Sequence, residues 1–417
     1  MSQERPQEEK TDGRETPAAP LTSLLTPVTL LGLAGYLFIG TAAVLIPSVM
    51  PFLTEEYLAT GLTLGMIGYI FWVRAGGGVL GNLLAGIGSD RIGYHRLVWI
   101  AALAVAATLA LTAAARPWLL FLGGFALISI AQASLATGIN AMIADANPDS
   151  RARALNVLHG VYAVGATISP LVFGLVLQWG VRWRWTVAAT GLIWLVYGGI
   201  SSLFYRSNGP SVDEGAKGQG LDWGMLRNAG FLSLFLIAFI YNGVAYSLLA
   251  WVALFMQESA GLGTLASISS VSVFYVALTA GRFICAAFAE RIGYARTLLV
   301  LAVVLIVIYP LMLLSTDPVV LMIGVFFTGL SLSGLFPTAL AYGSRLYPDK
   351  SGAVTGLLNV AMTAGAMLPP WWTGELADIW SFQTALGINY SMAWILIAVC
   401  VVLGRLERRT ASAVSTN

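Results

Sequence analysis

The heptapeptide DRIGYHR at Asp90–Arg96 returns 200 residues later as ERIGYAR at Glu290–Arg296. Identical residues also recur at this gap-free offset elsewhere in the chain. These pairs are Pro148 and Pro348, Leu158 and Leu358, Gly165 and Gly365, Pro170 and Pro370, and Gly174 and Gly374. Agreement at one offset in separate regions indicates a duplication. The chain is therefore predicted to consist of two related halves.

The composition is that of a protein embedded in a membrane. Of the 417 residues, 58% are hydrophobic and only 10% are charged, and the mean hydropathy is +0.80. This leaves too little polar surface to cover a soluble protein of this size. The net charge of +2, with basic residues spread along the chain, argues against a nucleic-acid partner. Cys285 and Cys400 lie apart in apolar runs and indicate neither a disulfide framework nor a metal cluster.

Twelve stretches are long and apolar enough to cross a bilayer, whose hydrocarbon core needs about 20 residues per helix. They lie at about 27–53, 62–87, 97–115, 117–143, 154–178, 184–205, 229–256, 265–288, 297–315, 318–343, 353–374 and 384–404. Hydrocarbon offers no partners for backbone groups, so each stretch must be helical. The sequence predicts an all-α membrane protein with twelve transmembrane helices in two pseudo-symmetric six-helix bundles.

The longest break between these stretches divides six helices from six. The predicted organisation is a disordered cytoplasmic tail (1–26), an N-terminal bundle (27–205), a cytoplasmic linker (206–228), a C-terminal bundle (229–404) and a second cytoplasmic tail (405–417). With the N-terminus inside, seventeen Lys and Arg residues fall in cytoplasmic segments and three in outer segments. We therefore expect an integral protein of the cytoplasmic (inner or plasma) membrane, with both termini in the cytoplasm.

The sequence contains no motif for covalent chemistry. It has no GxxxxGK[ST] phosphate loop, no HExxH and no GxSxG, and only two histidines. We expect no catalytic residue, no metal site and no cofactor. Duplicated helical halves that meet around a site at mid-membrane are typical of secondary transporters.

Polar side chains at membrane depth are costly in lipid, so they usually face a cavity or a partner. The fifth stretch carries Asn156, His159 and Tyr162 along one side of a helix. Other candidate solute contacts are Gln132, Asn140, Tyr241, Asn242, Tyr246, Asn359 and Thr363. Amides, hydroxyls and aromatic walls suit a polyhydroxylated or otherwise polar small molecule. The alternative is that these groups join neighbouring helices, each contributing roughly 0.6 kcal/mol.

Two arginines lie inside apolar stretches. Arg74, in FWVRAGGGVLG (Phe71–Gly81), is about a dozen residues from either end of its stretch, where no carboxylate is found. We expect it to point into a cavity near His159 and grip a carboxylate or paired hydroxyls. The alternative is that it ties its helix to the backbone carbonyls of a neighbour. Arg282 is nearer a cytoplasmic loop and is expected to reach the interface or to pair with Glu290.

The segment GIGSDRIGYHR at Gly86–Arg96 resembles the GxLxDRxGxxR motif of the major facilitator superfamily, and Glu290–Gly293 resembles its second copy. The resemblance covers essentially the whole chain and implies a secondary transporter whose halves rock about a central cavity. Glycines let helices approach and turn tightly, while Asp90 can meet a helix N-terminus or Arg91 and so latch one conformer. The latch residues are expected to be Gly86, Asp90, Arg91, Gly93, Arg96, Glu290 and Arg291. The alternative for the basic residues is simple anchoring at the membrane surface.

Two further segments, Gly329–Ala341 and Arg151–Gly174, resemble the branch that includes fucose and glucose permeases. This implies a sugar or sugar-derived solute, carried by what we expect to be a monomer among membrane lipids. The branch commonly carries embedded acids for proton coupling, but Ala136 and Ala245 stand at two of those places. The alternatives are uniport or antiport of a small organic or inorganic anion with Arg74, drug efflux, and a non-transporting sensor.

Overall fold

The computed structural model describes residues 26–204 and 222–415, and all of its regular elements are helices. The first half contains α1 (Pro27–Ala43), α2 (Leu45–Leu58), α3 (Leu64–Ile92), α4 (Tyr94–Ala114), α5 (Trp118–Ala146), η2 (Pro148–Ser150), α6 (Arg151–Gln178) and α7 (Trp183–Leu203). The second contains η3 (Trp223–Arg227), α8 (Ala229–Ala260), α9 (Thr264–Ile292), α10 (Tyr294–Leu314), α11 (Pro318–Leu332), α12 (Leu335–Leu346), η4 (Pro348–Lys350), α13 (Ser351–Ile379) and α14 (Phe382–Ser415). The predicted tail 1–26, apart from its last residue, and most of the predicted linker 206–228 lie outside the described residues.

Twelve helical spans in the described residues are long and apolar enough to cross a membrane, which confirms the predicted number and the all-α fold class. The first span consists of α1 and α2 together, and the tenth consists of α11 and α12 together. Helix α14 continues to Ser415, past residue 404 where the predicted bundle ends. Residues 405–415 contain neither Gly nor Pro, so nothing in the backbone ends the helix earlier.

The duplication is visible in the helix boundaries. Helices α3 and α9 begin and end 200 residues apart, as do α4 and α10. The turns between them are made by Gly93 (φ 77°) and Gly293 (φ 96°), in the left-handed region that favours glycine. The repeated sequences DRIGY and ERIGY thus build the same turn in both halves.

The first span breaks at Val44, which closes α1 and opens α2 with φ −100° and ψ 0°. Pro47 has no amide hydrogen and cannot donate to the carbonyl of Ala43, four residues earlier. The break therefore leaves the Ala43 carbonyl without its usual partner in the helix. This oxygen matters for the site described below.

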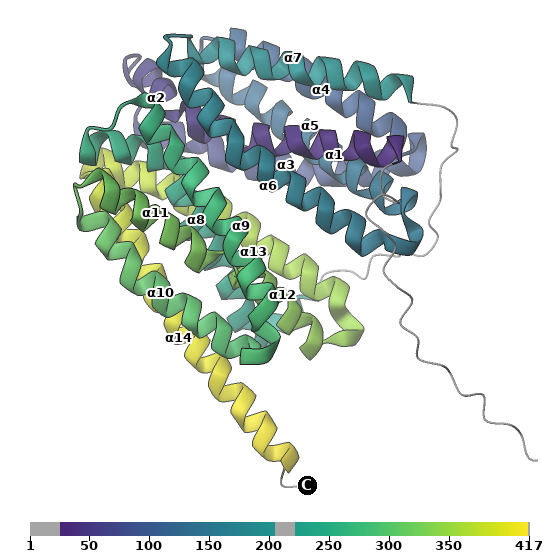
Figure 1. Cartoon of the computed structure of the whole chain (residues 1–417), viewed down its shortest axis with the longest axis vertical. Helices are drawn as coiled ribbons and strands as arrows, with labels where there is room; N and C mark the ends of the chain where they lie inside the picture. Colours follow the sequence, from purple (N-terminus) through teal and green to yellow (C-terminus); the bar gives the residue numbers. More distant parts are fainter. Residues whose placement is uncertain (1–25, 205–221, 416–417) are drawn as a thin grey trace, which may run out of the picture.

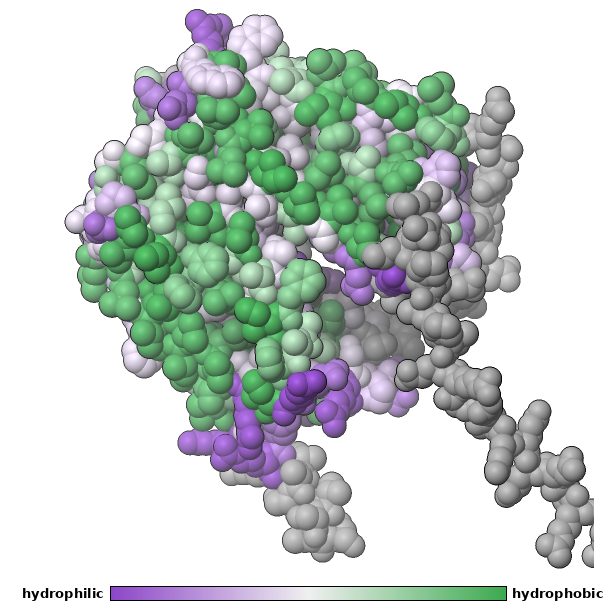
Figure 2. All heavy atoms as spheres, viewed as in Figure 1, coloured by the Kyte–Doolittle hydropathy of each residue, from purple (hydrophilic) through white to green (hydrophobic). Residues whose placement is uncertain are grey.

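Most helices pack within their own half. In the first half, α3 packs against α5, and α4 packs against α5 and α7; in the second, α8 packs against α13 and α14. The halves touch where α3 meets α13, α6 meets α9 and α2 meets α8. Figure 1 shows the two bundles meeting at one end and diverging towards the other. Figure 2 shows hydrophobic residues over the sides of both bundles, with hydrophilic residues gathered at their ends.

The two halves are hydrogen-bonded to each other at the closed end, where α3 begins and α13 ends. The Asp378 carboxylate accepts the amides of Leu64 and Gly65, both at 2.8 Å. The Thr63 hydroxyl accepts the amide of Met66 at 3.2 Å. The first three amides of α3 are therefore satisfied, two of them by the opposite half.

Close packing at the same end depends on small residues. A Cβ atom added to Gly65 would overlap the Glu375 carboxylate, and one added to Gly374 would lie 2.7 Å from the Leu64 carbonyl oxygen. A side chain at Gly374 would push α3 and α13 apart, whereas one at Gly65 would displace the carboxylate end of the flexible Glu375 side chain. The closed end is thus held by backbone contact as well as by Asp378.

Candidate solute-binding site

A polar cavity of about 410 Å³ lies between the two bundles. Polar groups from α3, α8 and α13 line it: Arg74, Asn82, Asn242, Tyr246, Asn359 and Thr363. Guanidinium, amide and hydroxyl groups from both halves therefore meet at one place. Its volume falls within the range of small-molecule sites, about 300–1,000 Å³.

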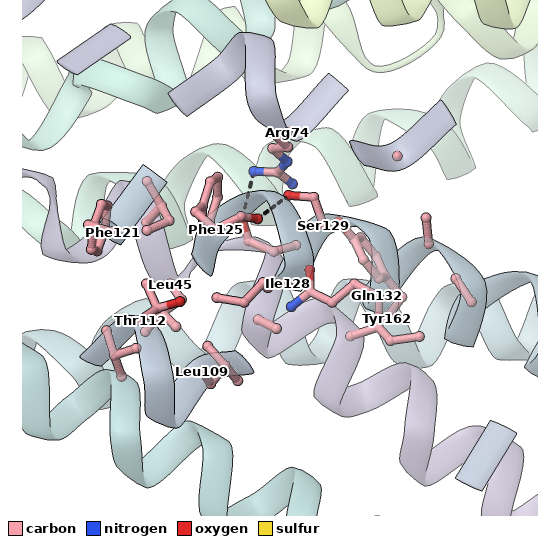
Figure 3. A pocket seen from close by; sticks show the side chains of 18 residues that line it. Leu45, Arg74, Leu109, Thr112, Phe121, Phe125, Ile128, Ser129, Gln132 and Tyr162 are labelled. Atoms are coloured by element: carbon pink, nitrogen blue, oxygen red, sulfur yellow. Dashed lines mark hydrogen bonds between the residues drawn. The ribbon is translucent and has the colours of Figure 1, made fainter. Parts of the chain in front are cut away.

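A second cavity, of about 220 Å³, lies within the first bundle and is largely apolar. Its polar residues include Arg74, Thr112, Ser129, Gln132 and Tyr162 (Figure 3). Arg74 lines both cavities. This arginine therefore stands where the two spaces adjoin.

The guanidinium of Arg74 is only lightly engaged by protein. Its Nη1 lies 3.5 Å from the Ala43 oxygen, the carbonyl that Pro47 cannot satisfy. Its central carbon lies 5.5 Å from the centre of the Tyr246 ring, in cation–π range. Among the described residues it makes no other hydrogen bond and no ion pair, so four of its five N–H groups remain available.

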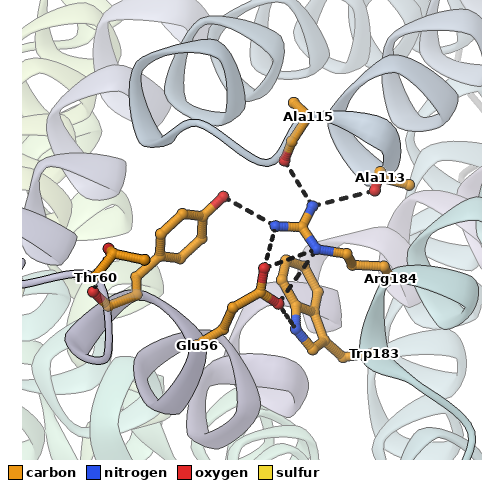
Figure 4. Close-up of polar contacts among 7 residues, drawn as sticks. Glu56, Thr60, Ala113, Ala115, Trp183 and Arg184 are labelled. Atoms are coloured by element: carbon orange, nitrogen blue, oxygen red, sulfur yellow. Dashed lines mark hydrogen bonds and ion pairs between the residues drawn. The ribbon is translucent and has the colours of Figure 1, made fainter.

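Arg184 at the start of α7 shows the opposite arrangement (Figure 4). It donates to the Glu56 carboxylate at 2.7 and 3.1 Å and to the Tyr57 hydroxyl at 3.2 Å. Its remaining N–H groups reach the carbonyls of Ala113 and Ala115 at 3.1 and 2.6 Å. All five donors are used within the first bundle, which is what a structural arginine requires.

The polar stripe of α6 extends beyond the two cavities. Tyr162 lines the smaller cavity. His159 packs edge-on against Tyr36, with ring centres 5.3 Å apart. Asn156 is exposed and lines neither cavity. Arg74 thus shares a cavity with Tyr162 but not with His159 or Asn156.

Two of the candidate amides join helices. Asn140 donates to the Tyr36 hydroxyl on α1 and to the Ala136 carbonyl at 3.0 Å. Asn242 on α8 donates to the Met362 carbonyl on α13 at 2.8 Å, although it also lines the cavity. For these two residues, the helix-joining role proposed as the alternative is present in the structure.

Arg282 contacts a tyrosine of the neighbouring helix α8. Its Nη2 lies 3.5 Å from the Tyr241 hydroxyl. Within the described residues it forms no ion pair with Glu290, so the pairing expected as one of two alternatives is not made; the other alternative, reaching the interface, stays a prediction. Eight residues along a helix span about 12 Å, and the side chain turns towards Tyr241 instead.

The residues expected to form the latch lie at the diverging end of the bundles, near the ends of α3 and α9 and the start of α4. Most are exposed: Gly86, Asp90, Arg91, Arg96, Glu290 and Arg291. Gly93 forms the turn described above. In the part of the chain that the structure covers, the Asp90 carboxylate has no hydrogen bond or ion pair. The expected latching contact is therefore not made in this arrangement.

Asn82 lines the larger cavity but was not among the candidates. Its carbonyl oxygen accepts the Thr137 hydroxyl at 2.9 Å, which leaves its NH₂ group available. The 200-residue offset aligns Asn82 with Arg282. Asn82 on α3 therefore occupies the position that Arg282 occupies on the equivalent helix α9. This correspondence in the sequence could have identified Asn82 as a candidate.

Twelve spans in two bundles around a polar cavity define a membrane transporter. The family model of the Major Facilitator Superfamily matches residues 32–318 and 269–416, and the chain belongs to this family. It is an integral membrane protein that moves a small polar solute by secondary transport.

The chain is similar to several known transporters over most of its length. It is 23% identical to the glucose/mannose transporter GlcP of Bacillus subtilis, with 92% of this chain and 96% of that one covered. It is 24% identical to the MFS-type transporter YfkL of the same organism, over 88% and 93% of the two chains. Among solved structures, the nucleoside transporter NupG has a TM-score of 0.70 at 14% identity, covering 90% of this chain and 98% of that one. A bacterial homologue of the lysosomal transporter Spinster, inward-facing and occupied, has 0.72 at 15% identity, covering 91% and 95%.

Proposed function

We propose that this protein carries a sugar or sugar-derived solute, unchanged, across the membrane by alternating access. The observation that carries the proposal is the cavity between the halves, which is lined by side-chain amides, hydroxyls and the aromatic ring of Tyr246. A solute rich in hydroxyl groups needs several hydrogen-bond donors and acceptors close together, as this cavity provides. The names of two relatives, a glucose/mannose transporter and a nucleoside transporter, are consistent with such a solute.

Three groups of the cavity are placed to contact the solute. The Asn359 side chain is exposed and, among the described residues, makes no hydrogen bond. Asn82 retains its NH₂ donors, and the ring of Tyr246 presents a flat apolar surface. Amides bind sugar hydroxyls in pairs, while an aromatic ring packs against the C–H face of a sugar.

The moving units are proposed to be the bundles 27–205 and 229–404, with both termini in the cytoplasm. The diverging end of the bundles would then face the cytoplasm, and the end closed by Asp378 would face outward. This arrangement corresponds to an inward-facing transporter, the state named for the similar Spinster homologue. An unengaged Asp90 supports it, since a cytoplasmic latch should be open in this state.

The test is uptake of labelled glucose, mannose and a nucleoside into proteoliposomes, with binding measured by isothermal titration calorimetry. We expect at least one to be taken up, and Asn359→Ala to weaken its binding about tenfold, which corresponds to about 1.4 kcal/mol for lost hydrogen bonding. Thr363→Val should also weaken binding. Thr60→Val is the matched control, because Thr60 likewise donates to a helix carbonyl but lies outside the cavity. Folded protein that neither binds nor transports any of these solutes would contradict the proposal.

A further inference from the structure

Two arginines stand at different depths along the space between the halves. Arg74 follows the first residue of α3 by ten positions, and Arg282 follows the first residue of α9 by eighteen. At 1.5 Å per residue, they lie about 15 and 27 Å from the closed end of their helices. Because α3 and α9 are equivalent helices of the two halves, Arg282 lies about 12 Å nearer the open end.

Both side chains face the space between the halves. Arg74 lines the larger cavity and faces Tyr246 of the second half. The Nη2 of Arg282 lies 3.5 Å from the Tyr241 hydroxyl, and the side chain is exposed. Helix α9, which carries Arg282, packs against α6 of the first half. The two arginines therefore lie along one path that runs from the open end to the deep cavity.

Neither charge is balanced by protein in the described residues. Each guanidinium makes one hydrogen bond, at 3.5 Å, and neither forms an ion pair. The carboxylates nearest to Arg74 and Arg282 in sequence, Asp90 and Glu290, lie near the ends of α3 and α9. An arginine at the centre of a bilayer costs about 2.5–3.5 kcal/mol even on the lenient insertion scale. This cost applies to Arg74, near the middle of α3. Arg282, exposed and nearer the open end, adds a second positive charge to the same path, and the two together favour an anion within it.

We propose that the sugar-derived solute bears an acid group, a carboxylate or a phosphate, that Arg282 attracts near the open end and Arg74 binds in the deep cavity. This inference rests on the function proposed above and narrows its substrate class. With four free N–H groups, Arg74 can hold two oxygens of the acid side by side. Asn82 and Asn359 line the same cavity and would then contact the hydroxyls of the sugar.

The two positions imply different effects when each arginine is removed. Arg74 is a binding group, so its loss should reduce equilibrium affinity for the acid much more than affinity for a neutral sugar. Arg282 contributes mainly by attraction at a distance, so its loss should slow association and reduce the salt dependence of that rate. Both effects are specific to charged solutes, which separates them from general damage to the cavity.

The experiment compares binding of glucose, glucuronate and glucose 6-phosphate to the purified wild type and to Arg74→Gln, Arg282→Gln and Arg182→Gln. Wild type should bind at least one acid more than tenfold more tightly than glucose, and the better acid identifies carboxylate or phosphate as the recognised group. Arg74→Gln should weaken binding of the acid much more than binding of glucose, so that the preference for the acid disappears. Arg282→Gln should slow association of the acid in stopped-flow measurements at low salt. Arg182→Gln, a matched change at the exposed residue just before α7, should behave as wild type.

Equal affinity of the wild type for glucose and both acids would overturn this inference and leave the proposed function standing. Failure of all three solutes to bind folded protein would overturn both. A loss in Arg182→Gln equal to that in Arg74→Gln would show that overall charge, not the cavity, sets the preference, and would also refute it. If Arg74→Gln does not fold, Arg74→Lys is the variant to test. Lysine keeps the positive charge but lacks the planar guanidinium that can bind two oxygens at once, so the preference for the acid over glucose should become smaller without disappearing.

Discussion

Arg74 and Arg184 are the same side chain in two opposite environments. All five donors of Arg184 are satisfied, and Glu56 balances its charge. Arg74 makes one long hydrogen bond and faces a cavity. A buried guanidinium needs partners for its charge and its N–H groups. Arg184 finds them in the protein, whereas four N–H groups of Arg74 have no partner among the described residues, and we propose that a solute binds them.

This contrast predicts different stabilities for two equivalent substitutions. Arg184→Gln leaves Glu56 without its ion-pair partner, with only the Trp183 indole N–H still donating to it, and leaves two carbonyls without donors. It should therefore destabilise the fold by about 1–3 kcal/mol. Arg74→Gln should change stability little. Thermal unfolding of both purified variants, followed by tryptophan fluorescence, measures the difference. A larger loss in Arg74→Gln than in Arg184→Gln would mean that Arg74 is the structural residue.

A second residue-scale prediction concerns Pro47. Replacing it by alanine supplies an amide for the Ala43 carbonyl and so removes the reason for Arg74 to hold that oxygen. Pro47→Ala should keep or raise stability but weaken solute binding, because the guanidinium loses its anchor. Pro51→Ala, one turn further along α2, is the control and should leave affinity unchanged. Calorimetric titration of both variants is the measurement, and equal affinities would show that Ala43 does not orient Arg74.

At the scale of elements, α3 is capped by a side chain of the other half. A carboxylate at a helix N-terminus meets unpaired amides and the positive end of the helix dipole. Asp378 therefore stabilises the closed end only while α3 and α13 remain together. The same contact must break whenever that end opens.

Asp378→Asn should weaken this closure by about 1 kcal/mol, or about a fivefold change in the ratio of closed to open molecules. Asp317→Asn is the matched control, because Asp317 caps α11 within its own half through the amides of Val319 and Val320. Spin labels at positions 60 and 380 would report the distance between the halves at this end. The fraction of molecules with the longer distance between the two labels should increase only in Asp378→Asn. An unchanged distance distribution in this variant would show that Asp378 does not hold the end closed.

At the scale of the whole molecule, one end is closed and the other is open, with Asp90 unengaged at the open end. If Asp90 latches the opposite conformer, Asp90→Asn should favour the arrangement described here. Transport should then slow more than equilibrium binding weakens, as measured by proteoliposome uptake and calorimetry on the same preparation. Equal losses in uptake and binding would argue against a latch.

The orientation in the membrane leads to a further prediction. Single cysteines at positions 90 and 349 should resist a membrane-impermeant maleimide in intact cells, and cysteines at 182 and 317 should react. The reason is the excess of Lys and Arg in the segments assigned to the cytoplasm. Labelling of position 90 or 349 from outside would reverse the assignment of the open and closed ends.

The sequence by itself determined the helical class, the twelve spans and the duplication. Each rests on a property that a local segment carries, namely apolar length, charge bias or a repeated turn such as that at Gly93 and Gly293. It also singled out Arg74, since a charge in an apolar run is conspicuous without any knowledge of its neighbours.

Only the tertiary structure decided which partners these residues have. The carbonyl of Ala43 beside Arg74, the turn of Arg282 towards Tyr241, and the cap of α3 by Asp378 join residues far apart in the chain or on different helices. Each depends on how the helices and the two halves are placed relative to one another. Helix periodicity states which face of a helix a residue occupies, but not which other helix lies against that face, because packing of whole bundles sets that choice.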